Sequence, residues 1–144
     1  MKEFEFEVEG IPKGKGRPRF ARKGNFVRAY TPKTTHDYEH HIAETYVYKG
    51  GTAFDYPYLG VYIIAYFPIP KSTRKADRLL METGCVWHNK KPDTDNVAKS
   101  VLDALNGIAW NDDKQVVSLK VKKYYGKVPK VIIKIKEIEN DNKQ

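Results

Sequence analysis

The chain has 144 residues, enough for one domain with a substantial hydrophobic core. It contains 26 Lys and Arg against 18 Asp and Glu, and the resulting net charge of +8 favours a polyanionic partner. A single cysteine, Cys85, excludes an intramolecular disulfide and agrees with a reducing cytoplasm. The sequence has no signal-like segment and no apolar run of about 18 residues, so we expect one soluble, cytoplasmic domain over residues 1–144.

The first predicted element is a half-buried strand over residues 2–8, where apolar and acidic side chains alternate. The basic segment 11–33 follows, and its glycines and prolines should break any regular element. We interpret this segment as a DNA-contacting loop, because cations neutralise phosphates and glycines allow close backbone approach; a solvated surface loop is the alternative. Three aromatic side chains either anchor the loop to the core or stack on unpaired bases: Phe20, Phe26 and Tyr30. The expected DNA-binding residues are Lys13, Lys15, Arg17, Arg19, Arg22, Lys23 and Arg28.

A helix is predicted from Thr34, as its N-cap, to about Lys49, where two glycines end it. Its apolar stripe consists of Tyr38, Ile42, Thr45 and Tyr46. Residues 59–67 are apolar on both faces and predict a central strand. The polar segment 71–91 comes next and begins with a short helix. Four cations on this helix contact the DNA backbone or form a solvated face: Lys71, Arg74, Lys75 and Arg78.

The segment 90–115 combines an amphipathic helix with acidic residues on either side of it. Pro92 disfavours helix at the residue before it, so the helix should begin near Asp95 or Asn96. Asn106 and Gly107 provide the stop. The apolar face comprises Val97, Val101, Ala104, Leu105 and Ile108, and the opposite polar edge carries Asp95, Lys99 and Asp103.

Four carboxylates bracket this helix: Asp93, Asp95, Asp112 and Asp113. Carboxylates that lie close together repel one another unless a cation intervenes, and Mg²⁺ prefers such hard oxygen ligands. Lys99 adds a positive charge suited to a phosphate oxygen. The set therefore indicates a metal-assisted phosphodiester hydrolase, provided that the chain after Trp110 returns beside the helix and brings both acidic pairs together. The alternative is that these acids only form turns and helix caps.

Two strands are predicted after the acidic segment, over residues 116–125 and 131–138. Gly126 and Pro129 should form the turn between them, so we expect an antiparallel hairpin. The last residues, 140–144, should be frayed. The predicted fold is a two-layer α+β domain, with two main helices on one face of a mixed sheet of about four strands.

A long motif links the acidic residues: Pro92-Asp93-Thr94-Asp95-Asn96, then Lys99, Leu102-Asp103-Ala104-Leu105-Asn106-Gly107, Trp110 and Asp112-Asp113-Lys114-Gln115-Val116. This motif closely resembles the RusA-type Holliday junction resolvases, a family of crossover junction endodeoxyribonucleases. The resemblance implies a homodimer that uses Mg²⁺, with Mn²⁺ as a substitute. It also implies a catalytic or phosphate-contacting role for Lys99 and metal-binding roles for Asp93, Asp95 and Asp113, with Asp112 as a further candidate.

We therefore expect a structure-specific endodeoxyribonuclease that resolves Holliday junctions by paired symmetric nicks during DNA recombination and repair. A twofold pair of sites would match a roughly twofold four-way or branched DNA. Two alternatives belong to other classes of protein. One is a non-catalytic branched-DNA-binding protein; the other is a nucleotide-sugar transferase with Asp93-Thr94-Asp95 as its D-x-D motif, which the short chain and the positive charge disfavour.

Overall fold

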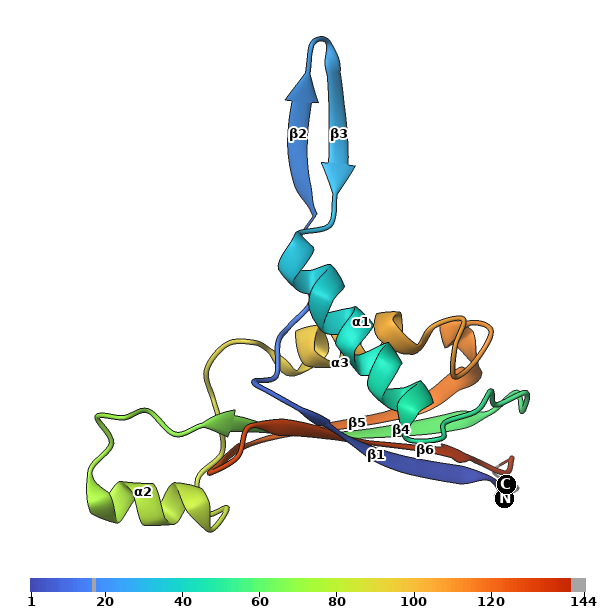
Figure 1. The fold of residues 1–144 in the computed structure, drawn as a ribbon. Coiled ribbons are helices and arrows are strands. Elements are labelled where there is room, and N and C mark those ends of the chain that lie inside the picture. Colours follow the sequence, from blue (N-terminus) through green and yellow to red (C-terminus); the bar gives the residue numbers. More distant parts are fainter. Residues whose placement is uncertain (17, 141–144) are drawn as a thin grey trace.

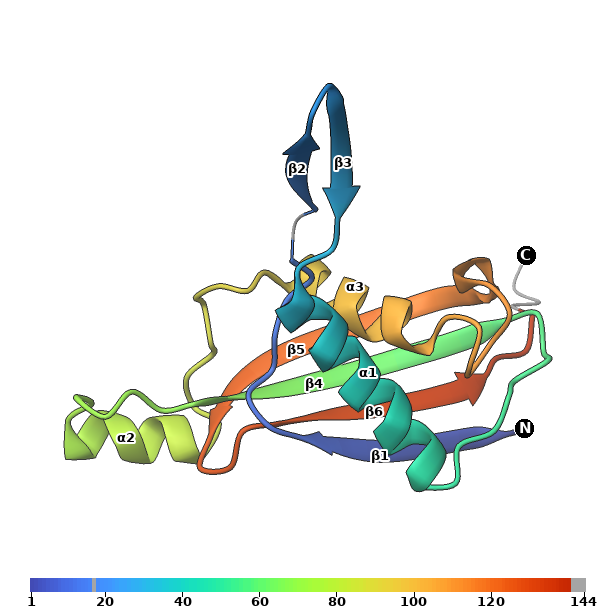
Figure 2. The same ribbon diagram turned by 45° about the horizontal axis from the view of Figure 1, so that its top comes forward.

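The computed structural model describes residues 1–16 and 18–140, which form a four-stranded sheet with α1 and α3 on one face (Figure 1). A two-stranded hairpin stands away from this two-layer body, and the short helix α2 lies beyond one end of the sheet (Figure 2). The elements are β1 (Glu3–Glu9), β2 (Arg19–Lys23), β3 (Phe26–Tyr30), α1 (Lys33–Tyr48), β4 (Leu59–Pro68), α2 (Lys75–Glu82), α3 (Thr94–Leu105), the 3₁₀ helix η1 (Asp113–Gln115), β5 (Val116–Gly126) and β6 (Lys130–Glu137). The predicted α+β fold, with two main helices on one face of a mixed sheet, is confirmed.

The sheet has the strand order β1-β6-β4-β5, in which only the β4 and β5 pair is parallel. The predicted central strand is therefore confirmed as β4, whereas the predicted β5–β6 hairpin is wrong. Strands β5 and β6 run in opposite directions, but β4 lies between them and bonds to both. The residues of β4 are buried or half-buried along nearly its whole length, so the strand needs partners along both of its edges, because an unpaired buried amide is costly. The local turn residues could not show that a third strand intervenes.

The core lies between the sheet and the two helices, and its buried residues form one cluster. Helix α1 contributes Tyr38, Ile42 and Tyr46, as the apolar stripe predicted, while Thr45 is only half-buried. The N-cap of α1 is Pro32 rather than Thr34. Helix α3 contributes Val97, Val101, Ala104 and Leu105, and it ends at the C-cap Asn106, as predicted. Ile108 was expected on this buried face but lies exposed beyond the helix end.

The basic segment 11–33 differs most from its prediction, because residues 19–30 form the antiparallel hairpin of β2 and β3 instead of a loop. A two-residue turn, Gly24-Asn25, joins the strands, and Gly24 has a φ of +61° at the first central position, as type II′ turns require. The glycine that was expected to break regular structure therefore creates the turn. Arg17 and residues 141–144 lie outside the described residues, and so do the predictions made for them.

No helix in the described part of the chain is both long and apolar enough to cross a membrane.

Candidate metal and DNA-binding site

Asp93 and Asp95 lie together at the N-terminal end of α3, the first as the N-cap and the second in the first turn. Both side chains are exposed. The backbone carbonyl of Asp93 accepts the helical hydrogen bond from Val97 N at 3.0 Å, but its carboxylate makes no capping bond. The positive end of the helix dipole stabilises negative charge at this position. The alternative that Asp93 acts as a side-chain cap is therefore not supported, and its carboxylate faces solvent.

Lys123, on β5, holds the segment that leads into this helix. Its buried ammonium donates to the carbonyls of Lys90 at 2.6 Å and Pro92 at 2.7 Å. Burial lowers the pKa of Lys123, while the nearby negative charge of Asp93 opposes this shift. The lysine thus fixes the backbone immediately before Asp93 and places a positive charge beneath the acidic pair.

The sequence analysis missed Lys123, although the spacing of its neighbours carried a signal. Lys123 lies two residues from both Val121 and Tyr125, so it shares their face of the strand. Tyr125 is buried and Val121 is half-buried on that face. A lysine on such a face must find buried hydrogen-bond partners, and this requirement could have marked it as a functional or structural residue.

The polar edge of α3 is partly occupied by a contact from the basic segment. Lys15 Nζ lies 2.6 Å from Glu39 Oε2 of α1 and 3.1 Å from Asp103 Oδ2 of α3. Burial lowers the pKa of Lys15, but the hydrogen bonds and charges of Glu39 and Asp103 outweigh it and raise the pKa overall. Lys15, which the sequence predicts as a DNA contact, anchors the segment to both helices. Lys99 is exposed one turn from Asp95 on the same edge.

The root of the hairpin is fixed on the first turns of α3. Lys15 N donates to the carbonyl of Asn96 at 3.0 Å, and Ser100 Oγ donates to the carbonyl of Lys13 at 2.9 Å. A Cβ added to Gly14 would lie 2.7 Å from Pro92 Cβ, so only glycine fits this close approach. The hairpin and the carboxylates at the helix entrance are thus parts of one continuous structure.

The segment that follows α3 extends beyond the other end of this helix (Figure 2), and it carries Asp112, the N-cap of η1, and Asp113, its first residue. Asp112 caps η1 by accepting from Lys114 N at 2.9 Å, and Asp113 Oδ1 accepts from Trp110 Nε1 at 3.0 Å. Helix α3 has 12 residues and is therefore about 18 Å long, and the two acidic pairs lie at its opposite ends. Among residues 1–16 and 18–140, no three His, Cys, Asp or Glu side chains gather in a set that could hold a metal ion. The expected convergence of both pairs within one chain is therefore not observed.

Comparison with known protein families gives a match to the family described as endodeoxyribonuclease RusA over residues 9–136, nearly the whole chain. The chain belongs to the RusA family. It is also 34% identical over 145 aligned positions to the uncharacterized protein YqaN of Bacillus subtilis (strain 168), with 94% of this chain and 96% of that protein covered. The predicted family is confirmed, and membership makes the protein an endodeoxyribonuclease of a family that acts on branched DNA.

RusA-type nucleases generally depend on a divalent metal, and the helix entrance of this member fits one in part. Mg²⁺ is usually bound by one or two carboxylates together with waters and substrate phosphates. Asp93 and Asp95 supply two such carboxylates at an exposed position. The three-acid set that includes Asp113 does not fit a single ion within one chain, because Asp113 lies at the opposite end of α3.

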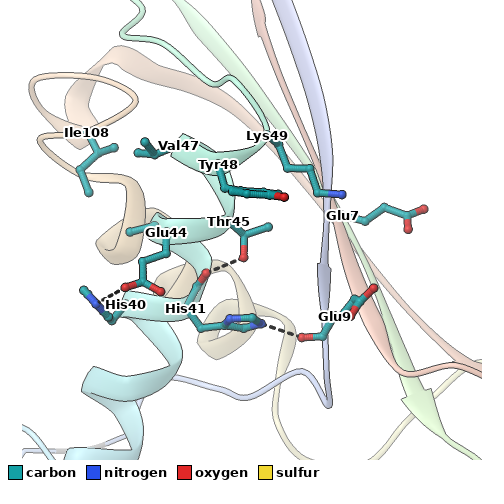
Figure 3. A pocket seen from close by; sticks show the side chains of 11 residues that line it. Glu7, Glu9, His40, His41, Glu44, Thr45, Val47, Tyr48, Lys49 and Ile108 are labelled. Atoms are coloured by element: carbon teal, nitrogen blue, oxygen red, sulfur yellow. Dashed lines mark hydrogen bonds and ion pairs between the residues drawn. The ribbon is translucent and has the colours of Figure 1, made fainter.

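A groove of about 910 Å³ on the outer side of α1 is lined by none of the candidate residues at the entrance of α3 (Figure 3). His40 pairs with Glu44 at 2.7 Å, and His41 Nε2 lies 2.9 Å from the carbonyl of Glu9. Three acids, Glu7, Glu9 and Glu44, line the groove against one lysine, Lys49, so its charge is unsuited to a DNA backbone.

Proposed function

We propose that the protein is a Mg²⁺-dependent, structure-specific endodeoxyribonuclease that resolves Holliday junctions by paired symmetric nicks in DNA recombination and repair. It acts in the cytoplasm as a homodimer, and Mn²⁺ substitutes for Mg²⁺. The observation that carries the proposal is the exposed pair Asp93 and Asp95 at the start of α3, where a backbone hydrogen bond from Lys15 to Asn96 attaches the root of a projecting basic hairpin. Positive charge suited to phosphates and negative charge suited to a metal thus lie on two elements that hydrogen bonds join at the root of the hairpin.

Each group at the helix entrance has a distinct role in this proposal. Asp93 and Asp95 would hold the metal ion, which when bound polarises a phosphoryl oxygen and lowers the pKa of a water. Lys99, one turn along α3, stabilises negative charge on the phosphate. Lys123 fixes the carbonyls of Lys90 and Pro92 and thereby the position of Asp93. The cations of the hairpin hold the arms of the junction.

The homodimer also bears on the role proposed for Asp113. Within one chain this carboxylate lies at the opposite end of α3, a helix about 18 Å long, and it joins no group of three acids or other ligands that could share an ion among the described residues. A second copy related by a twofold axis can bring its own Asp113 to the entrance of the first, and the reverse contact then follows by symmetry. Two identical sites would result, as two symmetric nicks require.

The test is cleavage of a labelled four-way junction beside a linear duplex of the same sequence, with and without Mg²⁺. The wild type should cut only the junction and only with metal, and Asp93→Asn should bind the junction but not cut it. Asp37→Asn is the matched control, because Asp37 is an exposed acid on α1 that pairs with Lys33 at 3.5 Å and lies outside the acidic segment 90–115. Tight junction binding by the wild type without cleavage under any divalent metal would overturn the proposal and leave a non-catalytic branched-DNA-binding protein.

A further inference from the structure

The hairpin of β2 and β3 exposes more apolar surface than an isolated pair of strands normally sustains. All ten strand residues are exposed, and the exposed fractions are 72% for Phe20, 79% for Phe26, 66% for Val27 and 45% for Tyr30. A two-stranded hairpin is marginally stable in water without a covering layer, and projecting apolar groups of this kind mark interaction sites. The hairpin stands clear of the two-layer body (Figure 1), so its partner comes from outside the chain.

The register of the hairpin places a phenylalanine ring on each of its faces. Phe26 pairs with Lys23 and shares a face with Tyr30 and Arg19, while Phe20 pairs with Ala29 on the other face. Cations occur on both faces beside these rings: Arg19, Lys23 and Arg28 on the first and Arg22 on the second. Each face therefore combines an aromatic ring with at least one positive charge.

The charge of the segment identifies the class of partner. Residues 11–33 contain eight Lys and Arg and no Asp or Glu, so the partner is a polyanion. Aromatic rings interleaved with cations are the usual arrangement for binding unpaired bases, in which the rings stack on bases and the cations neutralise phosphates. In continuous duplex the bases cover one another, whereas a branch point interrupts the stack and exposes base faces.

The anchoring of the hairpin joins its root to the helix that carries the candidate catalytic carboxylates. Lys15 N bonds to Asn96 in the first turn of α3, and Gly16 N bonds to Thr35 Oγ1 at the start of α1 at 3.2 Å. A base held by the hairpin and a phosphate held at Asp93 would therefore belong to the same branch of the DNA.

We propose that Phe20 and Phe26 stack on the bases exposed at the point of strand exchange, so that the hairpin reads the branch itself rather than duplex DNA. This inference rests on the proposed function, since it assumes branched DNA as the substrate. It assigns junction selectivity to the two rings and general DNA affinity to the surrounding cations.

The first test compares the affinity of wild type, Phe20→Ala and Phe26→Ala for a four-way junction and for a linear duplex, without divalent metal. Each substitution should weaken junction binding by about 5- to 150-fold, the usual effect of removing a base–aromatic stack, and leave duplex binding unchanged. Arg28→Ala should weaken both. Tyr48→Ala is the control, because Tyr48 is an aromatic residue on α1 that is 88% exposed, and its loss should change neither.

The second test places 5-iododeoxyuridine at the exchange point or in the middle of one arm and locates the photo-crosslinks by mass spectrometry. Crosslinks to Phe20 or Phe26 from the exchange point alone would support the stacking contact. Equal crosslinking from both positions, an equal loss of junction and duplex affinity, or a loss of dimerisation without DNA in the two Phe variants would overturn it. Wild-type protein that binds junction and duplex equally would instead count against the proposed function.

Discussion

The two ends of α3 carry similar acidic pairs that the fold treats differently. At the exit, Asp112 caps η1 and Asp113 accepts a hydrogen bond from the Trp110 indole. At the entrance, the carboxylate of Asp93 makes no cap bond, while Lys123 binds the backbone just before it. At the exit, the carboxylates themselves accept structural hydrogen bonds. At the entrance, the structural hydrogen bonds fix the backbone, and the carboxylates are left for another partner. Similar sequence patterns therefore differ in how the fold uses them, and a metal-binding role for Asp113 requires that its carboxylate serve Trp110 and the ion together.

The strongest way to test this difference is to remove one carboxylate from each end. Asp95→Asn should lower junction cleavage by about 100-fold or more with little change in stability, because it removes a proposed metal ligand that lies exposed in the first turn of α3. Asp112→Ala should instead lower the free energy of unfolding by about 0.5–2 kcal/mol through loss of its cap. Cleavage assays and urea unfolding measure the two effects. Normal cleavage by Asp95→Asn would contradict the assignment of this residue.

Mixing inactive variants tests whether the two ends meet in a dimer. Asp93→Asn and Asp113→Asn, refolded together, should recover about a quarter of the wild-type sites, because half of the dimers are mixed and each contains one intact site. These mixed dimers should nick one strand only. Asp93→Asn mixed with Asp95→Asn is the control and should stay inactive, since both changes lie at the same end. Failure of the first mixture would mean that Asp113 does not act across the dimer.

Replacing Lys123 tests whether this lysine fixes the position of Asp93 at the start of α3. Lys123→Met should lower the free energy of unfolding by about 1–3 kcal/mol, because the carbonyls of Lys90 and Pro92 lose their donor. It should also raise the Mg²⁺ concentration needed for cleavage, since Asp93 loses its fixed position. Lys122→Met, at the neighbouring half-buried position, is the matched control. Tighter Mg²⁺ binding in Lys123→Met would show that the lysine acts through its charge and not through positioning.

The smallest expected effect concerns pH and His88, which stacks on Phe67 near Lys123. Burial lowers the pKa of His88, and the charges of Lys123 and Lys90 add to this. As the pH falls, His88 therefore takes up a proton at a higher pH in the unfolded chain than in the folded chain. Its contribution to the free energy of unfolding is complete above about pH 6.5 and decreases as the pH falls below this value. Urea unfolding at about pH 8 and about pH 5 should show this loss, and His88→Phe should reduce it. His36→Gln, at an exposed position, should leave the loss unchanged.

Local patterns in the sequence predicted most of the regular elements. The period of apolar residues identified α1 and α3, and the two-sided apolar run identified β4. The motif around Asp93 and Asp95 identified the family and the end of α3 that carries the candidate site. Two further signals were present but were not used: the Gly24-Asn25 turn, which creates the hairpin, and the place of Lys123 on an apolar strand face.

The sequence by itself thus determined most elements, the family and the candidate residues, because helix and strand periods and turn residues act over a few positions. Only the tertiary structure decided that β4 separates β5 from β6, that Lys15 bonds to Glu39 and Asp103, and that α3 holds its two acidic pairs apart. These outcomes depend on which groups, distant in the sequence, bond to buried backbone and charged groups. Such partners can lie at any separation along the chain, so no fixed spacing of residues predicts them.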